Sequence, residues 1–321
     1  MNLGRIYNIN INISSPIVVL AGPTASGKSE LAISLCKKLN GTIINFDSMQ
    51  VYKELRIITA RPDISSENLA PHKLYGYMSG NNRCSAVLWK NKALEEIKLA
   101  LKLGSIPILV GGSGLYIKAM MDGLNNIPTT LSKYRNEAER ILHREGPENF
   151  YNIVKSKDPN IENNININDK QRLVRAYSVW LQTGKTLSDW IKSDKSKNVI
   201  SNKFLKIKLS PSRDTLRENI YKRFYKMLEQ DVLGEVDKIK NFDANLPIMK
   251  AHGVRELLSF IKKEISLEEA AKITINHTNQ YAKRQNTWFA HQYKEDYEIQ
   301  NYEDEIDKYC TNILCLYREL Y

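Results

Sequence analysis

The chain has 321 residues, of which 42% are hydrophobic and 26% are charged. These are ordinary values for a globular protein, and they exclude a chain that is disordered along its whole length. Lysine and arginine number 47 against 36 aspartates and glutamates, a net charge of +11, which suits a polyanionic partner such as nucleic acid without requiring one.

The cysteines and the apolar runs narrow the class of protein further. The four cysteines (Cys36, Cys84, Cys310 and Cys315) are scattered and form no C-x-x-C pair, so we expect reduced structural thiols rather than a disulfide framework or a zinc site. The N-terminal residues carry no signal-peptide pattern, and no apolar run approaches the roughly 20 residues that span a bilayer. We therefore expect a soluble, cytoplasmic protein that does not enter a membrane.

The first part of the chain alternates apolar runs with amphipathic segments. Short runs at 16–21, 42–46 and 106–110 predict buried strands. Helices are predicted from Lys28 to Leu39, where Gly41 is expected to stop the helix, and over 86–103. This alternation with short connections predicts a doubly wound parallel sheet with right-handed crossovers.

Strand signals end after residue 120. Residues 130–200 are polar and helical, with breaks at Gly146-Pro147, at Pro159 and in an Asn-rich stretch at 162–169. One more strand is predicted at 204–209, followed by helices at 212–230, 231–241, 253–262 and 266–291. We therefore predict an α/β core, residues 14–120 and 200–321, with a helical C-terminal part, interrupted by a helical insertion domain, residues 121–199.

The strongest motif lies between the first predicted strand and helix, where the sequence reads GPTASGKS, a complete G-x-x-x-x-G-K-S pattern. Such a loop turns successive backbone N–H groups toward a phosphate, its lysine reaches the terminal phosphates, and its hydroxyl can bind Mg²⁺. It predicts a phosphate-loop NTPase-like fold that binds a diphosphate or triphosphate, without requiring a nucleotide. The predicted phosphate-binding residues are Gly22, Pro23, Thr24, Ala25, Ser26, Gly27, Lys28 and Ser29, with Ser29 as the metal ligand.

An acid follows the second predicted strand, at Asp47, whereas the 106–110 strand ends in glycines and Ser113. The carboxyl ends of parallel strands lie at one edge of a sheet, so both residues are expected beside the phosphate loop around one crevice. A lone acid at a strand end can equally cap a turn. Its convergence with a phosphate loop favours a functional role.

Five phrases occur in an order that resembles the tRNA dimethylallyltransferases, also called tRNA isopentenyltransferases. They are GPTASGKS (22–29), NFDSMQVY (45–52), ILVGGSGLYIKA (108–119), NDKQRLVRAYSVW (168–180) and AKRQNTWF (282–289). The resemblance covers about residues 16–295. It implies transfer of the dimethylallyl group of dimethylallyl diphosphate to the exocyclic 6-amino group of the adenosine 3′ of the anticodon in tRNA.

The resemblance also implies roles for individual residues. Asp47 matches the acid that accepts a proton from the adenine amine, Arg223 a diphosphate-binding arginine, and Thr24 and Ser113 hydroxyl positions near the diphosphate. Mg²⁺ is the expected cofactor, and a monomer is expected. A channel should admit the base from one side and the prenyl diphosphate from the other. The residues expected at tRNA are Asp47, Ser48, Met49, Gln50, Leu115, Gln171, Arg172, Leu173, Val174, Arg175, Lys283 and Arg284.

Some features leave other interpretations open. Asn168 and Gln171 can form a helix-capping box instead of an RNA contact. Arg56 and Ile58 stand where family members tend to carry an acid and a glycine. Gly76 replaces an acid, and Val254 replaces a common tyrosine.

Three alternatives compete with the tRNA interpretation. A small-molecule kinase explains the phosphate loop, but it leaves Asp47 and the basic helices unexplained. A prenyltransferase of free adenine nucleotides shares the loop and the acid, and the arginine-bearing helices and the net charge of +11 count against it. An RNA-binding module with a vestigial loop does not need the intact Lys28 and Asp47.

Overall fold

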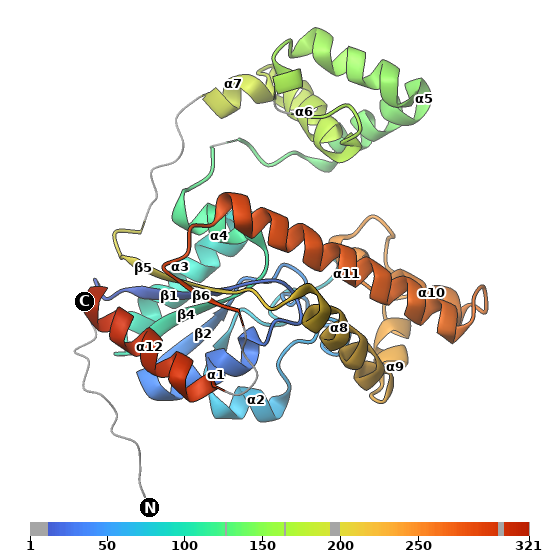
Figure 1. Cartoon of the computed structure of the whole chain (residues 1–321). Helices are drawn as coiled ribbons and strands as arrows, with labels where there is room; N and C mark the ends of the chain where they lie inside the picture. The colour runs from blue at the N-terminus through green and yellow to red at the C-terminus, as the bar shows by residue number, and fades with distance from the viewer. Residues whose placement is uncertain (1–11, 126, 164, 193–199, 301–304, 321) are drawn as a thin grey trace, which may run out of the picture. The chain divides into compact units, whose positions relative to one another are not determined.

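The computed structural model describes residues 12–125, 127–163, 165–192, 200–300 and 305–320 (Figure 1). The described chain divides into two compact units. The larger holds residues up to Met120 together with those from Ile200 onward, and the smaller holds Met121–Val199. Each unit has its own buried apolar core.

The described residues of the larger unit form a parallel sheet of six strands in the order β3-β2-β4-β1-β5-β6. The four strands predicted from apolar runs are confirmed to within a residue at each end, whereas the short edge strands β3 and β6 carry no signal in the sequence. Every residue of β1, β2 and β4 is buried, which explains the continuous apolar character of β1 and β4. The strands are β1 (Ile17–Ala21), β2 (Gly41–Asn45), β3 (His72–Lys73), β4 (Ile106–Gly111), β5 (Phe204–Leu209) and β6 (Tyr297–Ile299).

Helices cover both faces of this sheet, as a doubly wound fold requires. In Figure 1, α1 (Lys28–Leu39) and α12 (Ile306–Leu320) lie on one face, while α3 (Ala86–Lys102) and α4 (Gly114–Met121) lie on the other. The short helix α2 (Ile64–Leu69) precedes β3. The expected stop of α1 at Gly41 is wrong, because Asn40 takes the left-handed cap conformation, with φ 49°, and Gly41 already begins β2.

The helical C-terminal part comprises α8 (Arg213–Leu228), α9 (Val232–Asp237), the 3₁₀ turn η2 (Pro247–Lys250), α10 (Val254–Ile261) and α11 (Leu267–Gln292). Its apolar faces pack with the chain that follows β2, so Val51 and Leu55 share a core cluster with Phe224, Val236 and Leu257. This packing brings the C-terminal helices against the segment that carries Asp47. The predicted helix over 231–241 is shorter in the structure and ends at Asp237.

The smaller unit contains α5 (Ser132–Lys157), the 3₁₀ turn η1 (Ile161–Asn163), α6 (Lys170–Thr183) and α7 (Leu187–Lys192). The predicted break in the first of these helices is confirmed, because Gly146 leaves helical geometry with φ 77° and Pro147 follows it. The capping-box expectation for Asn168 and Gln171 is wrong, since Asp169 caps α6 and accepts from the backbone of Arg172. Among the described residues, no helix is both long and apolar enough to cross a membrane.

Candidate active site

The phosphate loop leaves the buried strand β1 and turns directly into α1 at Lys28. Gly27 makes this turn with φ 86°, a left-handed conformation that glycine adopts at least cost. The loop borders a cavity of about 520 Å³ that is lined by every residue from Thr24 to Ser29. The positive end of the helix dipole adds to the backbone N–H groups there, so the cavity is suited to an anion.

Side chains from α8 and α11 hold the phosphate loop from outside. Gln285, which is 5% exposed, accepts from the backbone N–H of Thr24 at 2.8 Å and donates to the carbonyl of Gly112 at 2.9 Å. Gly112 has no room for a side chain, because a Cβ there would lie 2.2 Å from the Gln285 amide. Asn219 of α8 donates to the carbonyl of Ala25 at 3.2 Å. These contacts tie the loop to the end of β4 and to the C-terminal helices.

Two cations face one carboxylate at this cavity. The guanidinium of Arg223 donates to the Thr24 hydroxyl at 2.8 Å, and the ammonium of Lys28 donates to Ser26 Oγ at 3.2 Å. Burial lowers the pKa of Lys28 to about 7 against the opposing effect of the Asp47 charge, and Arg223 lowers it further. Burial also lowers the pKa of Arg223 to about 10, again opposed by Asp47. A bound anion would stabilise both charges, so this pair favours a phosphate-bearing ligand.

Asp47 follows β2 in a tight turn that fixes its side chain. Its backbone N–H donates to Asn45 Oδ1 at 2.7 Å, and its own Oδ1 accepts from the N–H of Met49 at 2.9 Å. Oδ2 has no protein partner among the described residues, which leaves one carboxylate oxygen available to a substrate. A carboxylate held this way can accept a proton from a bound group.

Ser113 supports the same turn from behind. Its hydroxyl accepts from the N–H of Ser48 at 2.9 Å and donates to the Ser48 hydroxyl at 3.2 Å. Ser113 is buried and lines neither the cavity at the phosphate loop nor the adjoining chamber described next. Ser113 thus supports the Asp47-Ser48 turn and also hydrogen-bonds Tyr281, which lines the chamber, while its place near the diphosphate stays a prediction.

A second cavity adjoins the first. This chamber, of about 180 Å³, is lined by the apolar residues Ile220, Phe224, Met227 and Ile275 together with polar residues such as Lys250 and Thr278, and we call it the apolar chamber after the first group. Both cavities share four lining residues, Thr24, Asp47, Thr59 and Arg223. Asp47, the predicted proton acceptor, and Arg223, the predicted phosphate-binding arginine, therefore lie where the anion-binding cavity meets the apolar chamber.

Sequence reasoning missed other residues of this chamber. His252 and Tyr281 line it with their ring centroids 4.9 Å apart and their planes tilted by 46°, and burial lowers the pKa of His252 and raises that of Tyr281. Thr59 separates the two cavities. Only Tyr281 had a local signal, since it immediately precedes the AKRQNTWF phrase.

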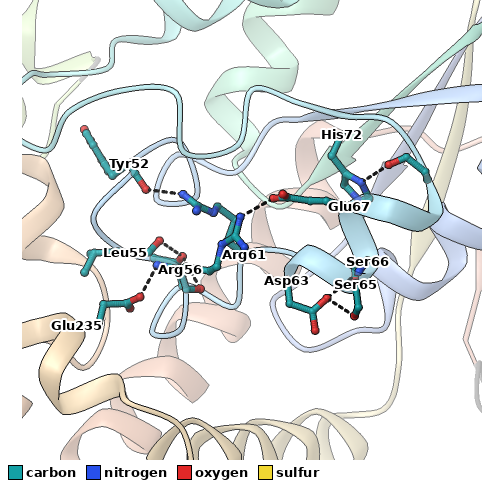
Figure 2. A network of polar contacts seen from close by, with 12 residues as sticks. Tyr52, Leu55, Arg56, Arg61, Asp63, Ser65, Ser66, Glu67, His72 and Glu235 are labelled. Carbon is teal, nitrogen blue, oxygen red and sulfur yellow. Dashed lines mark hydrogen bonds and ion pairs between the residues drawn. The ribbon is translucent and has the colours of Figure 1, made fainter.

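The unusual residues after Asp47 form a polar network of their own (Figure 2). Arg56 forms an ion pair of 2.8 Å with Glu67 of α2. The side chain of Arg61 lies over Gly76, where a Cβ would approach its guanidinium to 1.8 Å, and it donates to the carbonyl of Tyr52. Gly76 also has φ 53°, so a side chain at this position would have an unfavourable backbone and would displace the Arg61 guanidinium.

The residues predicted to bind tRNA in the larger unit differ in accessibility. Ser48, Met49 and Gln50 are half-buried beside Asp47, and the Gln50 amide donates to the carbonyls of Thr59 and Ala60. Leu115, on α4, is 59% exposed. Lys283 and Arg284 are exposed on α11, and the Arg284 guanidinium lies 5.9 Å from the ring centroid of Tyr281.

In the smaller unit, the segment predicted to bind tRNA, residues 171–175, lies partly in the hydrophobic core. Leu173 and Val174 are buried in the cluster between α5 and α6, so their side chains pack the unit and cannot reach RNA. Gln171 and Arg172 are exposed, and Arg172 pairs with Asp169 at 3.2 Å. Arg175 is half-buried and donates to the carbonyl of Pro128 at 2.9 Å.

The oxygen donors next to the phosphate loop suit one kind of metal ion. No group of three or more His, Cys, Asp or Glu side chains in the described ranges could hold a metal alone. Ser29, Glu30 and Asp47 nevertheless line the phosphate-loop cavity. Mg²⁺ is usually held by one or two protein oxygens together with substrate phosphates and water, so these donors fit Mg²⁺ that is bound with a diphosphate.

Known proteins resemble this chain over most of its length. The IPP transferase family model matches residues 50–292. The tRNA dimethylallyltransferase of Nitrobacter hamburgensis is 43% identical over 280 residues, which cover 87% of this chain and 88% of that protein. The tRNA dimethylallyltransferase of Wolbachia pipientis subsp. Culex pipiens is 42% identical, with 86% of this chain and 93% of that protein covered.

Solved structures agree with these sequence matches. The tRNA delta(2)-isopentenylpyrophosphate transferase of Staphylococcus epidermidis aligns with a TM-score of 0.67 at 30% identity, covering 96% of this chain and all of that one. A eukaryotic dimethylallyltransferase acting on tRNA aligns with a TM-score of 0.73 at 27% identity, covering 86% of this chain and 70% of that one.

Proposed function

The chain belongs to the IPP transferase family, the tRNA dimethylallyltransferases, and we propose that it prenylates one adenosine of the anticodon loop of tRNA. The donor is dimethylallyl diphosphate, and the acceptor is the exocyclic 6-amino group of the adenosine 3′ of the anticodon. The products are isopentenyladenosine and diphosphate.

One observation carries this proposal, namely the junction at Asp47 and Arg223 of a cavity beside the phosphate loop with a chamber whose lining is partly apolar. A prenyl diphosphate is half anion and half hydrocarbon. Its diphosphate suits the phosphate loop, and its prenyl group suits the lining of the chamber. The reacting carbon joins these halves, so it lies near the shared residues, where the Asp47 carboxylate is available.

The reaction follows from these positions. The amine nitrogen attacks the allylic carbon, the carbon–oxygen bond breaks, and diphosphate leaves with the bonding electrons. The amine is a weak nucleophile because its lone pair is delocalised into the adenine ring. Asp47 accepts a hydrogen bond and then a proton from the amine, which keeps electron density on the nitrogen as the new bond forms. Lys28, Arg223 and the loop N–H groups stabilise the leaving diphosphate.

Mg²⁺ is part of the proposal as a cofactor. Ser29 would hold it together with oxygens of the diphosphate, and when bound it would neutralise part of the charge on the leaving group. Lys28 and Arg223 provide the remaining positive charge.

Charge and exposure support the tRNA part of the proposal. The net charge of +11 and the exposed Lys283 and Arg284, on the helix that also lines the chamber, suit an RNA backbone. In the smaller unit the exposed Arg172 is the corresponding candidate. The target base must leave the stacked anticodon loop to reach Asp47, so base flipping is part of the proposal.

A product assay tests the proposed function. The purified chain with Mg²⁺ and dimethylallyl diphosphate is given an anticodon stem-loop, AMP, or the same stem-loop with guanosine at the target position, and mass spectrometry detects an added prenyl unit. We expect modification of the adenosine stem-loop alone. Prenylation of AMP would indicate an enzyme of free nucleotides. Phosphoryl transfer or hydrolysis when ATP is supplied, with no prenylation, would indicate a kinase-like activity.

A further inference from the structure

One face of α8 follows the phosphate loop. Asn219 donates to the carbonyl of Ala25 at 3.2 Å, and Arg223, one turn later, donates to the Thr24 hydroxyl at 2.8 Å. Residues three and four apart lie on the same face of a helix, so the next residue of this face is Lys226. Lys226 lines the phosphate-loop cavity together with Arg223. The face thus presents an amide, a guanidinium and an ammonium in sequence beside the loop.

The ammonium of Lys226 is available to an anion. Its side chain is exposed, and within the described ranges it has no hydrogen bond or ion pair. Lys28 and Arg223, in contrast, already donate to Ser26 and Thr24. Lys226 also lines two further cavities that border the loop, of about 1080 Å³ and about 310 Å³. An anion that moves between these cavities and the phosphate-loop cavity therefore meets this ammonium.

The order of side chains on α8 matches the order of groups in a prenyl diphosphate. Ile220, Phe224 and Met227 line the apolar chamber from this helix, and Lys226 does not. Arg223 lines both the chamber and the phosphate-loop cavity, whereas Lys226 lines only the second of these. A donor with its prenyl group in the chamber therefore places its first phosphate near Arg223 and its terminal phosphate toward Lys226.

Another wall of the phosphate-loop cavity is held in place by hydrogen bonds. Thr59 and Ala60 line the cavity, and their carbonyls accept from the Gln50 amide at 2.9 and 3.0 Å. Just before them, the buried carboxylate of Glu235 on α9 accepts from three consecutive backbone N–H groups that begin at Arg56, at 2.7, 2.8 and 2.9 Å (Figure 2). Charge-assisted hydrogen bonds of this kind fix the backbone. This wall is therefore preformed, and the long side chain of Lys226 can adjust to a ligand that lies against it.

We propose that Lys226 is a further donor-binding residue, whose ammonium contacts the terminal phosphate of the prenyl diphosphate. This inference rests on the proposed function and adds a residue to its diphosphate site. Among the described residues that line the phosphate-loop cavity, three can carry positive charge, Lys28, Arg223 and Lys226, and two are acids, Glu30 and Asp47. Without Lys226 the two signs are equal in number, so this lysine gives the cavity its excess of positive charge.

Calorimetry with two ligands tests this contact. The full chain, Lys226→Gln and the control Lys222→Gln are titrated with dimethylallyl diphosphate or with dimethylallyl monophosphate. Mg²⁺ and the guanosine stem-loop are present, and this stem-loop lacks the 6-amino group, so no transfer occurs. Lys222 is one turn earlier on α8 and is also exposed, but it pairs with Glu218 at 2.6 Å and does not line the phosphate-loop cavity. Both variants lose the same charge from the same helix.

The expected result is a loss of diphosphate affinity caused by Lys226→Gln alone. Its Kd for dimethylallyl diphosphate should rise about tenfold, because one charge-assisted contact is lost. Binding of the monophosphate, which has no terminal phosphate, should stay within about twofold of wild type in each variant. Lys226→Arg keeps the charge and should bind the diphosphate within about threefold of wild type. Because Lys226 is exposed, the effect of Lys226→Gln should shrink when salt is raised from about 0.1 to about 1 M.

Other outcomes would overturn the inference. Unchanged binding of the diphosphate by Lys226→Gln would show that the contact does not exist. Equal losses in Lys226→Gln and Lys222→Gln would show an effect of net charge alone. Equal losses for the diphosphate and the monophosphate would contradict the assignment to the terminal phosphate. A wild-type chain that bound neither ligand would instead contradict the proposed function, and the inference would fall with it.

Discussion

Replacing Gln285 with leucine should loosen the phosphate loop and leave the exposed Lys283 and Arg284 of α11 in place. The leucine has a similar size but cannot accept from Thr24 or donate to Gly112, so two hydrogen bonds of 2.8 and 2.9 Å are lost. Each bond contributes about 0.5–1.5 kcal/mol, and a buried group left without a partner costs about 1–3 kcal/mol. Gly112 is buried, whereas Thr24 borders the cavity, where water can replace the lost partner.

The free energy of unfolding should therefore fall by about 2–6 kcal/mol, counting two lost bonds and one orphaned carbonyl. The KM for dimethylallyl diphosphate should rise about tenfold or more because the loop N–H groups lose their alignment. Urea unfolding and steady-state kinetics measure these quantities, and the affinity for an anticodon stem-loop should stay near that of wild type. Gln285→Glu keeps an acceptor for Thr24 but places a carboxylate against the Gly112 carbonyl, so it separates the two halves of the contact.

Gln280→Leu is the matched control, because Gln280 lies on the same helix with an exposed side chain. Such a surface change should stay within about 0.5 kcal/mol of wild type. The reasoning would be refuted if Gln285→Leu unfolded like this control and kept the wild-type KM for the prenyl diphosphate.

The remaining predictions concern the charges of the site. Lys28→Met should weaken binding of dimethylallyl diphosphate about 100-fold while leaving stem-loop affinity near wild type, as calorimetry would show; equal losses of both would indicate misfolding. Because the pKa of Lys28 is about 7, proton uptake on binding inorganic diphosphate near pH 7 should exceed that of Lys28→Met. In the unfolded chain the lysine keeps its proton until the pH nears 10.5. The free energy of unfolding of the wild type should therefore rise relative to that of Lys28→Met as the pH increases from 7 to 10.5. Arg223→Lys should raise the KM for the donor about tenfold, since one charge remains but the fork that bonds Thr24 is lost; an unchanged KM would argue against a diphosphate contact. Stem-loop affinity should fall linearly on a log–log plot against salt, and a flat plot would argue against phosphate contacts.

The sequence predicted the sheet where burial leaves a continuous apolar run. β1 and β4 were found this way, β5 was found although its burial alternates along FLKIKL, and the phosphate loop located the site at the end of β1. β3 and β6 have two and three residues, too few for any periodicity to appear. Gly41 was misassigned because an asparagine can take the left-handed cap that glycine usually provides.

Parts of the candidate site depend on contacts that no local pattern reveals. The loop motif and the acid after β2 indicated Lys28 and Asp47, because their residue types follow strand ends in a recognisable order. Gln285 lies 261 residues from Thr24, and Glu235 lies 179 residues from Arg56. Each is one polar residue on an amphipathic helix, where a solvent-facing role is the usual interpretation. Only the packing of α9 and α11 against the core turns them into supports of the site.

The pairing of a prenyl diphosphate with an acceptor amine at Asp47 is the central claim, and one measurement tests it most directly. The single-turnover rate of dimethylallyl transfer to an anticodon stem-loop is compared between the wild-type chain and Asp47→Asn, with the binding of both substrates measured in parallel. The side chain of asparagine has nearly the same size and shape but cannot take up the amine proton. We predict that the rate falls by about 10²–10⁴-fold while both affinities stay close to wild type. A variant that transfers the prenyl group at nearly the wild-type rate would contradict the assignment of Asp47 as the base.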